Sequence, residues 1–384
     1  MKTTVTKFVS ADRTIQPSLR ESIRRVSAVG VAALLMLTVA GCSDSTVSPT
    51  DSTSSPDGSS SVSPAKLVDS PYAEIPQSLV EAAKKEKGEV LWYESAQEVQ
   101  VQPLIKAFTE KYPFAKVKHV TLLGTDVSSR VLQETAAGAA TADIATSGAS
   151  TIFALNEQGV LSSVDWITAG IPKQLVNNDY SILQIGQPYG IVYNPELVTG
   201  EDIPSTWEDL LDPKWKDKKI CTWLHATPLA NLVTVWGPSK TQDFVNKLVD
   251  QRPAVLPSSK CAQDIGAGIE PIGIDNAQNF KRAQVAGAPV AMIFPDPASL
   301  DLLVSTIPKN AANPETAKLF LSWLATKEGS DLYEKDVFRG NPLLPDSAAH
   351  KLLSGLKLAA WPLEESAEYL TWVDKFTKQL HGVQ

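Results

Sequence analysis

The chain has 384 residues, of which 43% are apolar and 20% charged, an ordinary globular composition that allows roughly two to three domains and excludes fibrous or wholly disordered proteins. Lys and Arg number 35 against 43 Asp and Glu, so the net charge of −8 argues against a nucleic-acid partner. With four His and three Cys, the chain has almost no material for a His-based metal cluster, and we expect neither a metal site nor a cofactor.

The first 41 residues have the pattern of an export signal peptide. Six Lys or Arg precede an uncharged, mostly apolar stretch from Val26 to Ala40, which as a helix would reach about 22 Å and could not span a bilayer core of roughly 30 Å. The stretch ends in Leu-Thr-Val-Ala-Gly-Cys (37–42), which resembles the lipobox of bacterial lipoproteins. The resemblance implies a mature N-terminus at Cys42 that carries lipid, palmitate included. The alternative is a buried apolar strand that happens to end in Cys.

Residues 42–65 form a predicted disordered linker after the signal peptide, rich in Ser, Thr and Pro. Residues 43–64 contain two apolar side chains, Val47 and Val62, too few to offset the entropy of ordering the backbone. As a coil, this segment would span roughly 25 Å, enough to hold a folded body clear of a membrane. Loss of residues 1–41 removes six basic and two acidic residues and changes the net charge from −8 to −12, so the body is acidic.

The body alternates helix and strand signals from Ser78 onward. We expect helices over 79–87, 101–112 and 126–137 and one that ends at Gln158, with strands over 88–93, 115–122 and 142–146. The second helix presents one apolar face, with Pro103 expected in its first turn. This alternation indicates an α/β fold with a mainly parallel sheet, in which ligands lie beyond the carboxyl ends of the strands.

The segment from Gln187 to Ile220 carries the most specific motif. A strand over 187–195 should be followed by a short helix with Ser205 as N-cap, Glu208 completing a capping box and Pro213 at its end. Residues 204–220, PSTWEDLLDPKWKDKKI, resemble the hallmark of extracellular solute-binding proteins of ABC importers, in particular the subgroup with ferric-iron-, thiamine-, polyamine- and aminophosphonate-binding members. Residues 286–295, 312–324 and 327–329 match further segments of that subgroup, so the resemblance covers most of residues 86–345.

The resemblance implies a two-lobed type 2 periplasmic-binding-protein fold with two hinge crossings and C-terminal helices. We place the crossings near 184–194 and 290–300, lobe 1 at 70–194 plus 298–384, and lobe 2 at 195–297. The implied partners are a small-molecule ligand, an ABC importer permease and the membrane, through lipid on Cys42; no nucleic acid is expected, and the protein should be a monomer. It would lie at the extracellular face of the bacterial cytoplasmic membrane, or on the periplasmic side where an outer membrane exists.

A secreted hydrolase is the alternative from another class. The sequence has no G-x-S-x-G, H-E-x-x-H or G-x-x-x-x-G-K-[ST] motif and no G-x-G-x-x-G after a strand, so no catalytic apparatus is visible and we expect no enzyme activity. Scattered catalytic residues would leave no such motif. Turnover of candidate substrates, against stoichiometric binding without consumption, separates the two hypotheses.

Cys221 and Cys261 are the thiols that remain if Cys42 is lipidated. An oxidising compartment favours a disulfide between them. Its loop of about 40 residues would stabilise the fold by roughly 4 kcal/mol in the chain-entropy model. The alternative is two buried free thiols.

The candidate ligand-binding residues lie at strand ends, at helix starts and near the crossings. They are Tyr93, Glu94, Ser95, Thr146, Ser147, Tyr189, Tyr193, Trp223, Thr227, Asp275, Asn276 and Asp296. Structural alternatives exist for each: a helix cap for Ser147 or Ser150 and for Asp275-Asn276, core or hinge packing for Tyr193 and Trp223, and a turn for Asp296 between two prolines. His225 is expected to form hydrogen bonds rather than to ligate a metal.

The ligand's charge follows from how this set departs from the family pattern. Ferric-binding relatives use two adjacent tyrosines where this chain has Asp275-Asn276, which counts against naked ferric ion. The candidates include three carboxylates and several aromatic rings but no Lys or Arg. They therefore favour a small organic cation, such as a polyamine or a thiamine-like compound, with ferric iron or an iron complex as the alternative.

Overall fold

The computed structural model describes residues 70–382 except residue 87 and residues 258–259. The predicted signal peptide, the lipidation site Cys42 and the linker lie outside these residues. None of the helices in the described part of the chain combines the length and apolarity needed to cross a bilayer.

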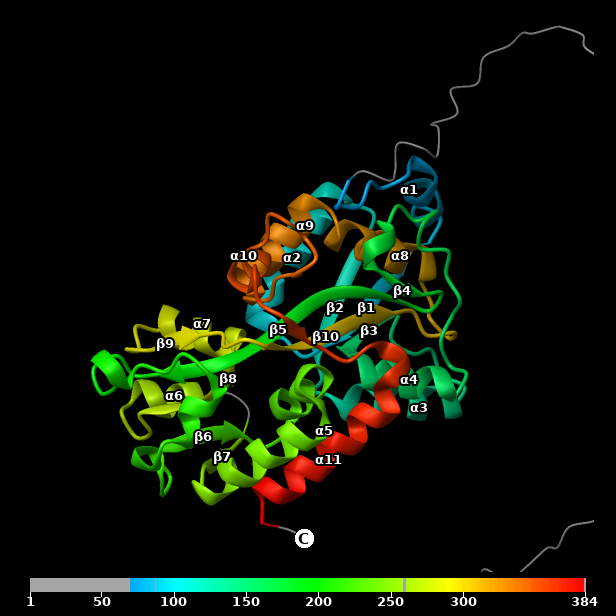
Figure 1. The fold of residues 1–384 in the computed structure, drawn as a ribbon. Coiled ribbons are helices and arrows are strands. Elements are labelled where there is room, and N and C mark those ends of the chain that lie inside the picture. The colour runs from blue at the N-terminus through cyan, green and yellow to red at the C-terminus, as the bar shows by residue number, and fades with distance from the viewer. Residues whose placement is uncertain (1–69, 87, 258–259, 383–384) are drawn as a thin grey trace, which may run out of the picture. The chain divides into compact units, whose positions relative to one another are not determined.

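The described strands form one mixed sheet (Figure 1). They are β1 (Glu89–Glu94), β2 (Lys116–Thr121), β3 (Ile144–Gly148), β4 (Val176–Asn178), β5 (Ser181–Tyr193), β6 (Ile220–Trp223), β7 (Ala254–Leu256), β8 (Ile272–Asn276), β9 (Ala291–Ile293), β10 (Ala298–Thr306) and β11 (Leu358–Ala359). Their order is β2-β1-β3-β10-β5-β8-β6-β7, with β4 and β9 on β5 and β11 on β10.

The helices pack around this sheet. They are α1 (Gln77–Ala83), α2 (Glu98–Lys111), α3 (Thr125–Ala136), α4 (Ala149–Glu157), α5 (Thr227–Asp250), α6 (Lys260–Gly266), α7 (Ala277–Val285), α8 (Pro314–Leu324), α9 (Lys327–Leu332), α10 (Ala348–Leu353) and α11 (Ser366–Leu380). Short 3-10 helices cover 173–175, 200–202, 207–211, 213–215 and 363–365, and a π-helical turn covers Tyr333–Val337.

Strand direction divides the sheet into two parallel ends and an antiparallel centre. β2, β1 and β3 are parallel at one end, and β8, β6 and β7 are parallel at the other. Between them, β10 runs antiparallel to both β3 and β5, and β5 runs antiparallel to β8. The expectation of a mainly parallel sheet is therefore wrong at the centre, where the two long strands β5 and β10 join the two ends.

Each end of the sheet has its own hydrophobic core. Trp92, Phe108 and Phe320 belong to the core at the β1 end, with ring centroids 4.8–5.2 Å apart for the two pairs that include Phe320. Trp207 and Phe376 belong to the core at the β6 end. The C-terminal helix α11 contacts both α4 and α5, and Figure 1 shows it beside α5. It thus connects the covering helices of the two ends.

Two expected helices have other bounds and capping residues in the structure. α1 ends at Ala83 rather than Lys87, and Glu86 instead accepts hydrogen bonds from the backbone N–H groups of Glu315 and Thr316 at the start of α8 (3.0 and 2.8 Å). The helix expected after Ser205 is a 3-10 helix over Trp207–Leu211, capped one residue later by Thr206 with Asp209 completing the box. Pro213 does not end it but begins the next 3-10 helix.

Two smaller expectations also need correction. Pro103 lies in the second turn of α2 because the helix begins at Glu98. β3 extends to Gly148, which is the N-cap of α4 and provides no side-chain cap. Neither Ser147 nor Ser150 therefore caps α4, and the Ser147 hydroxyl instead donates to the carbonyl oxygen of Gly124 (3.4 Å).

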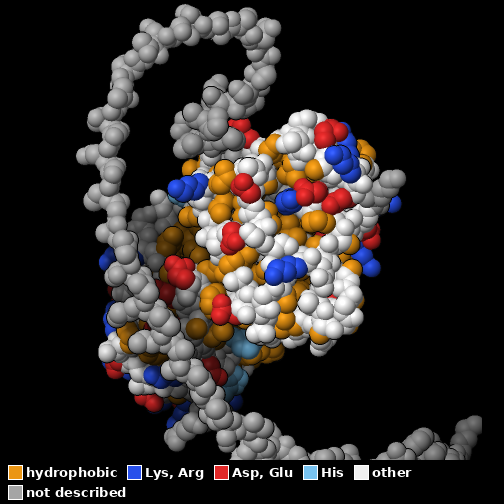
Figure 2. Space-filling model, turned by 90° about the vertical axis from the view of Figure 1, so that its right-hand side faces the viewer, with side chains coloured by type: hydrophobic (Ala, Val, Ile, Leu, Met, Phe, Trp, Pro, Cys, Tyr) orange, Lys and Arg blue, Asp and Glu red, His pale blue; other side chains and the backbone are white. Residues whose placement is uncertain are grey.

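The face of the body shown in Figure 2 mixes acidic, basic and apolar side chains.

Candidate functional site

β1 ends in a fully buried carboxylate, Glu94. One oxygen accepts from the backbone N–H of Ala96 (2.5 Å), and the other from the hydroxyl of Ser95 (3.2 Å). The guanidinium of Arg339 forms an ion pair with the same carboxylate. Two predicted ligand-binding residues, Glu94 and Ser95, are thus bound to an arginine that the sequence did not single out.

An irregular segment after the π-helical turn positions Arg339. Phe338 has a left-handed backbone (φ 61°), a conformation that is costly for a bulky residue and is frequent at functional sites. The carbonyl oxygen of Gly340 accepts from the backbone N–H of Gly186 in β5 (3.0 Å), which ties the segment to the central strand. Arg339 is 6% exposed, and its Nη1 also donates to Ser95 Oγ (3.0 Å). Its Nε is buried without a partner.

Tyr189 on β5 brings aromatic character to the same region. Its ring stacks on Trp223 at the end of β6, with centroids 6.2 Å apart and planes at 20°. Its hydroxyl accepts from Gln187 Nε2 (3.1 Å). Burial raises the pKa of Tyr189 well above its usual value of 10.0, so the hydroxyl stays protonated. Trp223 in turn meets the ring of His225 edge-on at 5.2 Å.

Asp275 and Asn276 are the last two residues of β8 and directly precede α7. Asp275 is 1% exposed and accepts three hydrogen bonds, from the backbone N–H groups of Ala262 (3.0 Å) and Asn276 (2.7 Å) and from Asn279 Nδ2 (2.8 Å). Burial raises its pKa to about 6 in spite of these bonds. Asn276 caps α7, accepting from the N–H of Asn279 (2.8 Å), and lies directly across from Tyr189 in the β5–β8 pairing.

Asp301 on β10 is a further acidic residue in this region that the sequence did not single out. It accepts a hydrogen bond from the hydroxyl of Tyr369 on α11 (3.2 Å), and burial raises its pKa to about 6. The charge of Arg339 acts on both Asp301 and Tyr189, so these groups lie within electrostatic range of one another. Thr227, the first residue of α5, is buried.

Two contacts link α7, at the β8 end of the sheet, to segments at the β1 end. Arg282 Nη2 donates to Gln100 Oε1 of α2 (3.2 Å), and Gln278 Nε2 donates to the carbonyl oxygen of Val337 in the π-helical turn (2.9 Å). Burial, followed by the nearby charge of Arg339, lowers the pKa of Arg282. Side chains from both ends of the sheet therefore meet at one place.

The remaining predicted residues have other contacts. Tyr93 donates to Glu134 of α3 (2.7 Å), and Thr146 accepts from Trp92 Nε1 (3.0 Å) and bonds Ser305 (2.7 Å) in the core. Tyr193 packs against the core at the β6 end. Asp296 is exposed and accepts from the backbone N–H of Lys357 (2.9 Å).

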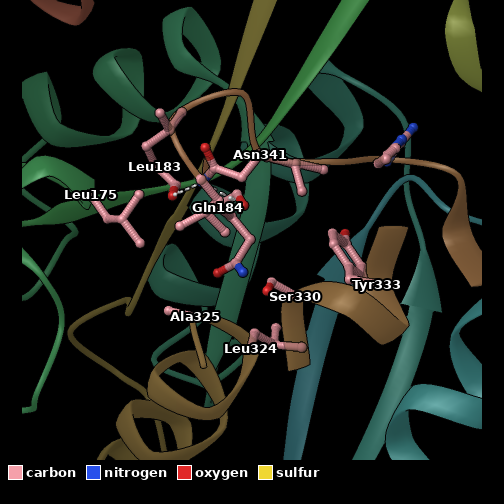
Figure 3. Close-up of a pocket in the computed structure, with 11 residues that line it drawn as sticks. Leu175, Leu183, Gln184, Leu324, Ala325, Ser330, Tyr333 and Asn341 are labelled. Atoms are coloured by element: carbon pink, nitrogen blue, oxygen red, sulfur yellow. Dashed lines mark hydrogen bonds between the residues drawn. The ribbon is translucent and has the colours of Figure 1, made fainter. Parts of the chain in front are cut away.

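A small cavity adjoins Arg339 (Figure 3). It has a volume of about 10 Å³, close to what one water molecule occupies, and is too small for a solute. Gln184 and Tyr333 line it with side-chain oxygens that are buried without partners, while the Asn341 amide donates to the carbonyl oxygens of Leu183 and Gln184 (3.2 and 3.3 Å).

Cys221 and Cys261 form the predicted disulfide, with Cα atoms 5.5 Å apart. It joins β6 to α6 and packs against Gly273, where a Cβ would lie 2.5–2.6 Å from both sulfur atoms. Among the described residues, no group of three or more His, Cys, Asp and Glu side chains is arranged to hold a metal ion.

Comparisons with known proteins agree with this architecture. Residues 103–360, more than half of the chain, match the sequence profile of the bacterial extracellular solute-binding proteins. An uncharacterized protein of Haemophilus influenzae is 31% identical over 143 residues, which cover 34% of this chain and 40% of that protein; the chain thus matches less than half the length of this relative.

Three solved structures with similar folds are distant from this chain in sequence. The substrate-binding protein of an ABC transporter from Agrobacterium tumefaciens has a TM-score of 0.66 at 19% identity, with 76% of this chain and 95% of that one covered. AfuA from Actinobacillus pleuropneumoniae, with fructose-6-phosphate bound, has a TM-score of 0.64 at 23% identity (77% and 99% covered). Iron-bound HitA from Pseudomonas aeruginosa has a TM-score of 0.62 at 16% identity (75% and 99% covered). The predicted α/β, two-lobed type 2 periplasmic-binding-protein fold is confirmed, and the chain belongs to the bacterial extracellular solute-binding proteins.

Proposed function

We propose that the protein captures a small ligand between its two lobes and delivers it to the permease of an ABC importer. The observation that carries this proposal is that polar side chains from the two ends of the sheet bond to each other. Arg282 of α7, which follows β8, donates to Gln100 of α2, which follows β1, and Gln278 of α7 donates to the carbonyl oxygen of Val337. Its family consists of binding proteins rather than enzymes, as the sequence predicted, which counts against the hydrolase alternative.

A hinge motion would let such a site open to admit a solute and then close around it. β10 pairs with β3, and β5 pairs with both β10 and β8, so these two central strands join the ends of the sheet. The α7 contacts to Gln100 and Val337 would open when the lobes separate. A bound ligand should therefore make the protein more compact and raise its free energy of unfolding by about 2.7 kcal/mol at a hundredfold excess over Kd. A tight ligand that leaves the small-angle scattering radius unchanged would contradict hinge closure. The lobe boundaries 70–194 plus 298–384 and 195–297 stay a prediction.

Lipid on Cys42 would hold the protein at the extracellular face of the cytoplasmic membrane. The proposal rests on the lipobox-like hexapeptide and the linker after it. Cys42→Ser should release the body into the medium or leave an unprocessed precursor. A mature form that still partitions into detergent would contradict it, and size-exclusion chromatography of the released body tests the expected monomer.

The organic-cation hypothesis for the ligand loses one of its premises. It assumed carboxylates without a basic residue nearby, but Arg339 pairs with Glu94, and Asp275 already accepts three hydrogen bonds. What still supports a cation is Asp301, together with the rings of Tyr189 and Trp223. The ferric-iron or iron-complex alternative keeps the fold of HitA in its favour, without a described cluster of metal ligands.

One experiment would identify the ligand most directly. The gently purified protein should release its solute on denaturation, and mass spectrometry with a metal assay on the same sample would distinguish an organic molecule from iron. Stoichiometric recovery of one small molecule supports the proposed function. Consumption of a candidate substrate by the purified body would overturn it.

A further inference from the structure

Two arginines from distant parts of the chain face the same region of the structure. Arg282 lies on α7 and is partly buried, whereas Arg339 follows the π-helical turn and is 6% exposed. Both guanidinium groups bond to the short segment at the start of α2: Arg339 donates to Ser95 Oγ (3.0 Å) and Arg282 to Gln100 Oε1 (3.2 Å), which also accepts from the backbone N–H of Gln97 (3.2 Å). The charge of Arg339 accordingly contributes to the lowered pKa of Arg282. Two positive charges near each other in a partly buried region repel, and a negative group between them removes that repulsion.

The described acidic side chains compensate only one of these two charges. Arg339 forms its ion pair with Glu94. Arg282 donates one hydrogen bond, to the neutral amide oxygen of Gln100, and no described Asp or Glu forms an ion pair with it. The negative charge of Asp275 partly offsets the lowering of the Arg282 pKa, but Asp275 forms no ion pair with Arg282. Its oxygens accept hydrogen bonds from Ala262, Asn276 and Asn279.

Both arginines also retain unused donors. The Nε atoms of Arg282 and of Arg339 are buried and have no hydrogen-bond partner. A buried donor without a partner is costly, and an uncompensated buried charge more so. Guanidinium groups offer a planar fork of N–H donors that matches the oxygens of a carboxylate or phosphate. An oxyanion would therefore both accept hydrogen bonds from the unpaired donors and compensate the excess positive charge.

We infer that the ligand carries an oxyanion, a phosphate or carboxylate group, which Arg282 and Arg339 hold together. The inference rests on the proposed function, because it assumes that a solute occupies this site. Arg282 comes from the β8 end of the sheet, whereas Glu94 and Ser95, which orient Arg339, come from the β1 end. An oxyanion bound by both arginines would therefore also hold the two ends together. Asp301 is left to accept a hydrogen bond from a hydroxyl or amine elsewhere on the ligand.

Calorimetry on the wild type and two variants tests the inference. Arg282→Gln removes the uncompensated charge, and Lys281→Gln is the matched control, since Lys281 is an exposed neighbour on the same helix and donates a hydrogen bond to Gln284. The probes are inorganic phosphate, fructose 6-phosphate and citrate as anions, and spermidine and thiamine as cations. At least one anion should bind the wild type at millimolar concentration or below. Arg282→Gln should weaken that binding about 30- to 100-fold, and Lys281→Gln by less than about twofold.

The ligand-free thermal midpoint serves as the folding check. Because Arg282→Gln relieves repulsion without exposing a carboxylate, its midpoint should equal or exceed that of the wild type, which separates lost binding from lost fold. Citrate against the two phosphates distinguishes the kinds of oxyanion. Equal anion affinity in Arg282→Gln, or no anion binding at millimolar concentration, would overturn the inference. Binding of spermidine or thiamine alone would overturn it as well, yet leave the proposed binding function intact, whereas turnover of a probe would count against the function itself.

Discussion

Two buried carboxylates lie at the carboxyl ends of strands on opposite sides of the sheet, Glu94 on β1 and Asp275 on β8, and the protein compensates their charges differently. Glu94 contacts a full positive charge, the guanidinium of Arg339. Asp275 contacts neutral N–H groups from Ala262, Asn276 and Asn279. Both side chains are at most 1% exposed, so the difference lies in the partners rather than in the burial.

The partners also come from different distances along the chain. Arg339 is 245 residues from Glu94, so this compensation exists only once the C-terminal part has folded back. The partners of Asp275 lie within 13 residues, and one of them, Ala262, follows the disulfide-bonded Cys261. Local dipoles hold Asp275 in place without balancing its charge, which agrees with its raised pKa of about 6. The β1 end thus depends on one long-range ion pair, and the β8 end on local amides and a disulfide.

The largest expected effect follows from breaking the ion pair. Arg339→Met should lower the free energy of unfolding by about 3–5 kcal/mol, because it leaves Glu94 charged, buried and without a counter-ion. Urea denaturation measures the loss. The double variant Glu94→Gln/Arg339→Met should recover much of it. Arg130→Met removes an exposed arginine on α3 as the control and should change stability by less than about 1 kcal/mol. Equal losses at positions 130 and 339 would show that the pair does not matter.

Removing the disulfide should have the next largest effect. Cys221→Ser/Cys261→Ser should cost about 4 kcal/mol in the chain-entropy model, since the cross-link closes a loop of 40 residues. Denaturant titration of both proteins, with and without reductant, provides the measurement. Reductant should weaken the wild type towards the variant and leave the variant unchanged. If reduced and oxidised wild type were equally stable, the disulfide would contribute nothing to the β8 end.

The raised pKa of Asp275 predicts a smaller, pH-dependent effect. In the unfolded chain the carboxyl group has its ordinary pKa of 3.8, whereas burial in the folded protein raises that pKa to about 6. The unfolded state therefore releases its proton first, so this residue's contribution to stability falls as the pH rises between about 4 and 6, by about 3 kcal/mol in total. Asp275→Asn should remove that slope, apart from a pH-independent loss of one acceptor oxygen. Parallel curves of stability against pH for the two proteins would contradict the raised pKa.

The sequence predicted the fold better at the ends of the sheet than at its centre. The β1, α2, β2 and α3 elements follow from apolar periodicity, which is local. Periodicity does not specify strand direction, and the antiparallel pairing of β5 with β10 joins residues more than a hundred positions apart, such as Tyr189 and Ser299. The motif at 204–220 indicated the family, yet its helix cap differs by one residue, with Trp207 fully buried just after the observed cap.

The same distinction explains what the sequence revealed about the site. Glu94 and Asp275 were found because they end apolar strands. Arg339 could not be found, since its segment is irregular and its position depends on the distant contact between Gly340 and Gly186. In the sequence, Arg282 stands next to Lys281 and has the pattern of an exposed basic residue on a helix. Its partial burial results from the contact of α7 with α2, which the sequence does not show. The prediction about the charge of the ligand therefore took into account two of the five charged groups at the site, Glu94 and Asp275, and missed Asp301, Arg282 and Arg339.

The smallest expected effects concern the first turns of the helices that follow strands β8 and β3. Asn276 caps α7 with its side chain, whereas Gly148 at the same place before α4 has no side chain to do so. Asn276→Ala should cost about 1 kcal/mol, and Gly148→Asn should gain a few tenths, because a Cβ at position 148 meets no atom within 4 Å and the backbone there has an ordinary negative φ. Thermal unfolding of the two variants at one pH measures both. If Gly148→Asn lost as much stability as Asn276→Ala, the residues at these two positions would have a role other than capping. Ligand binding would then be the first role to test.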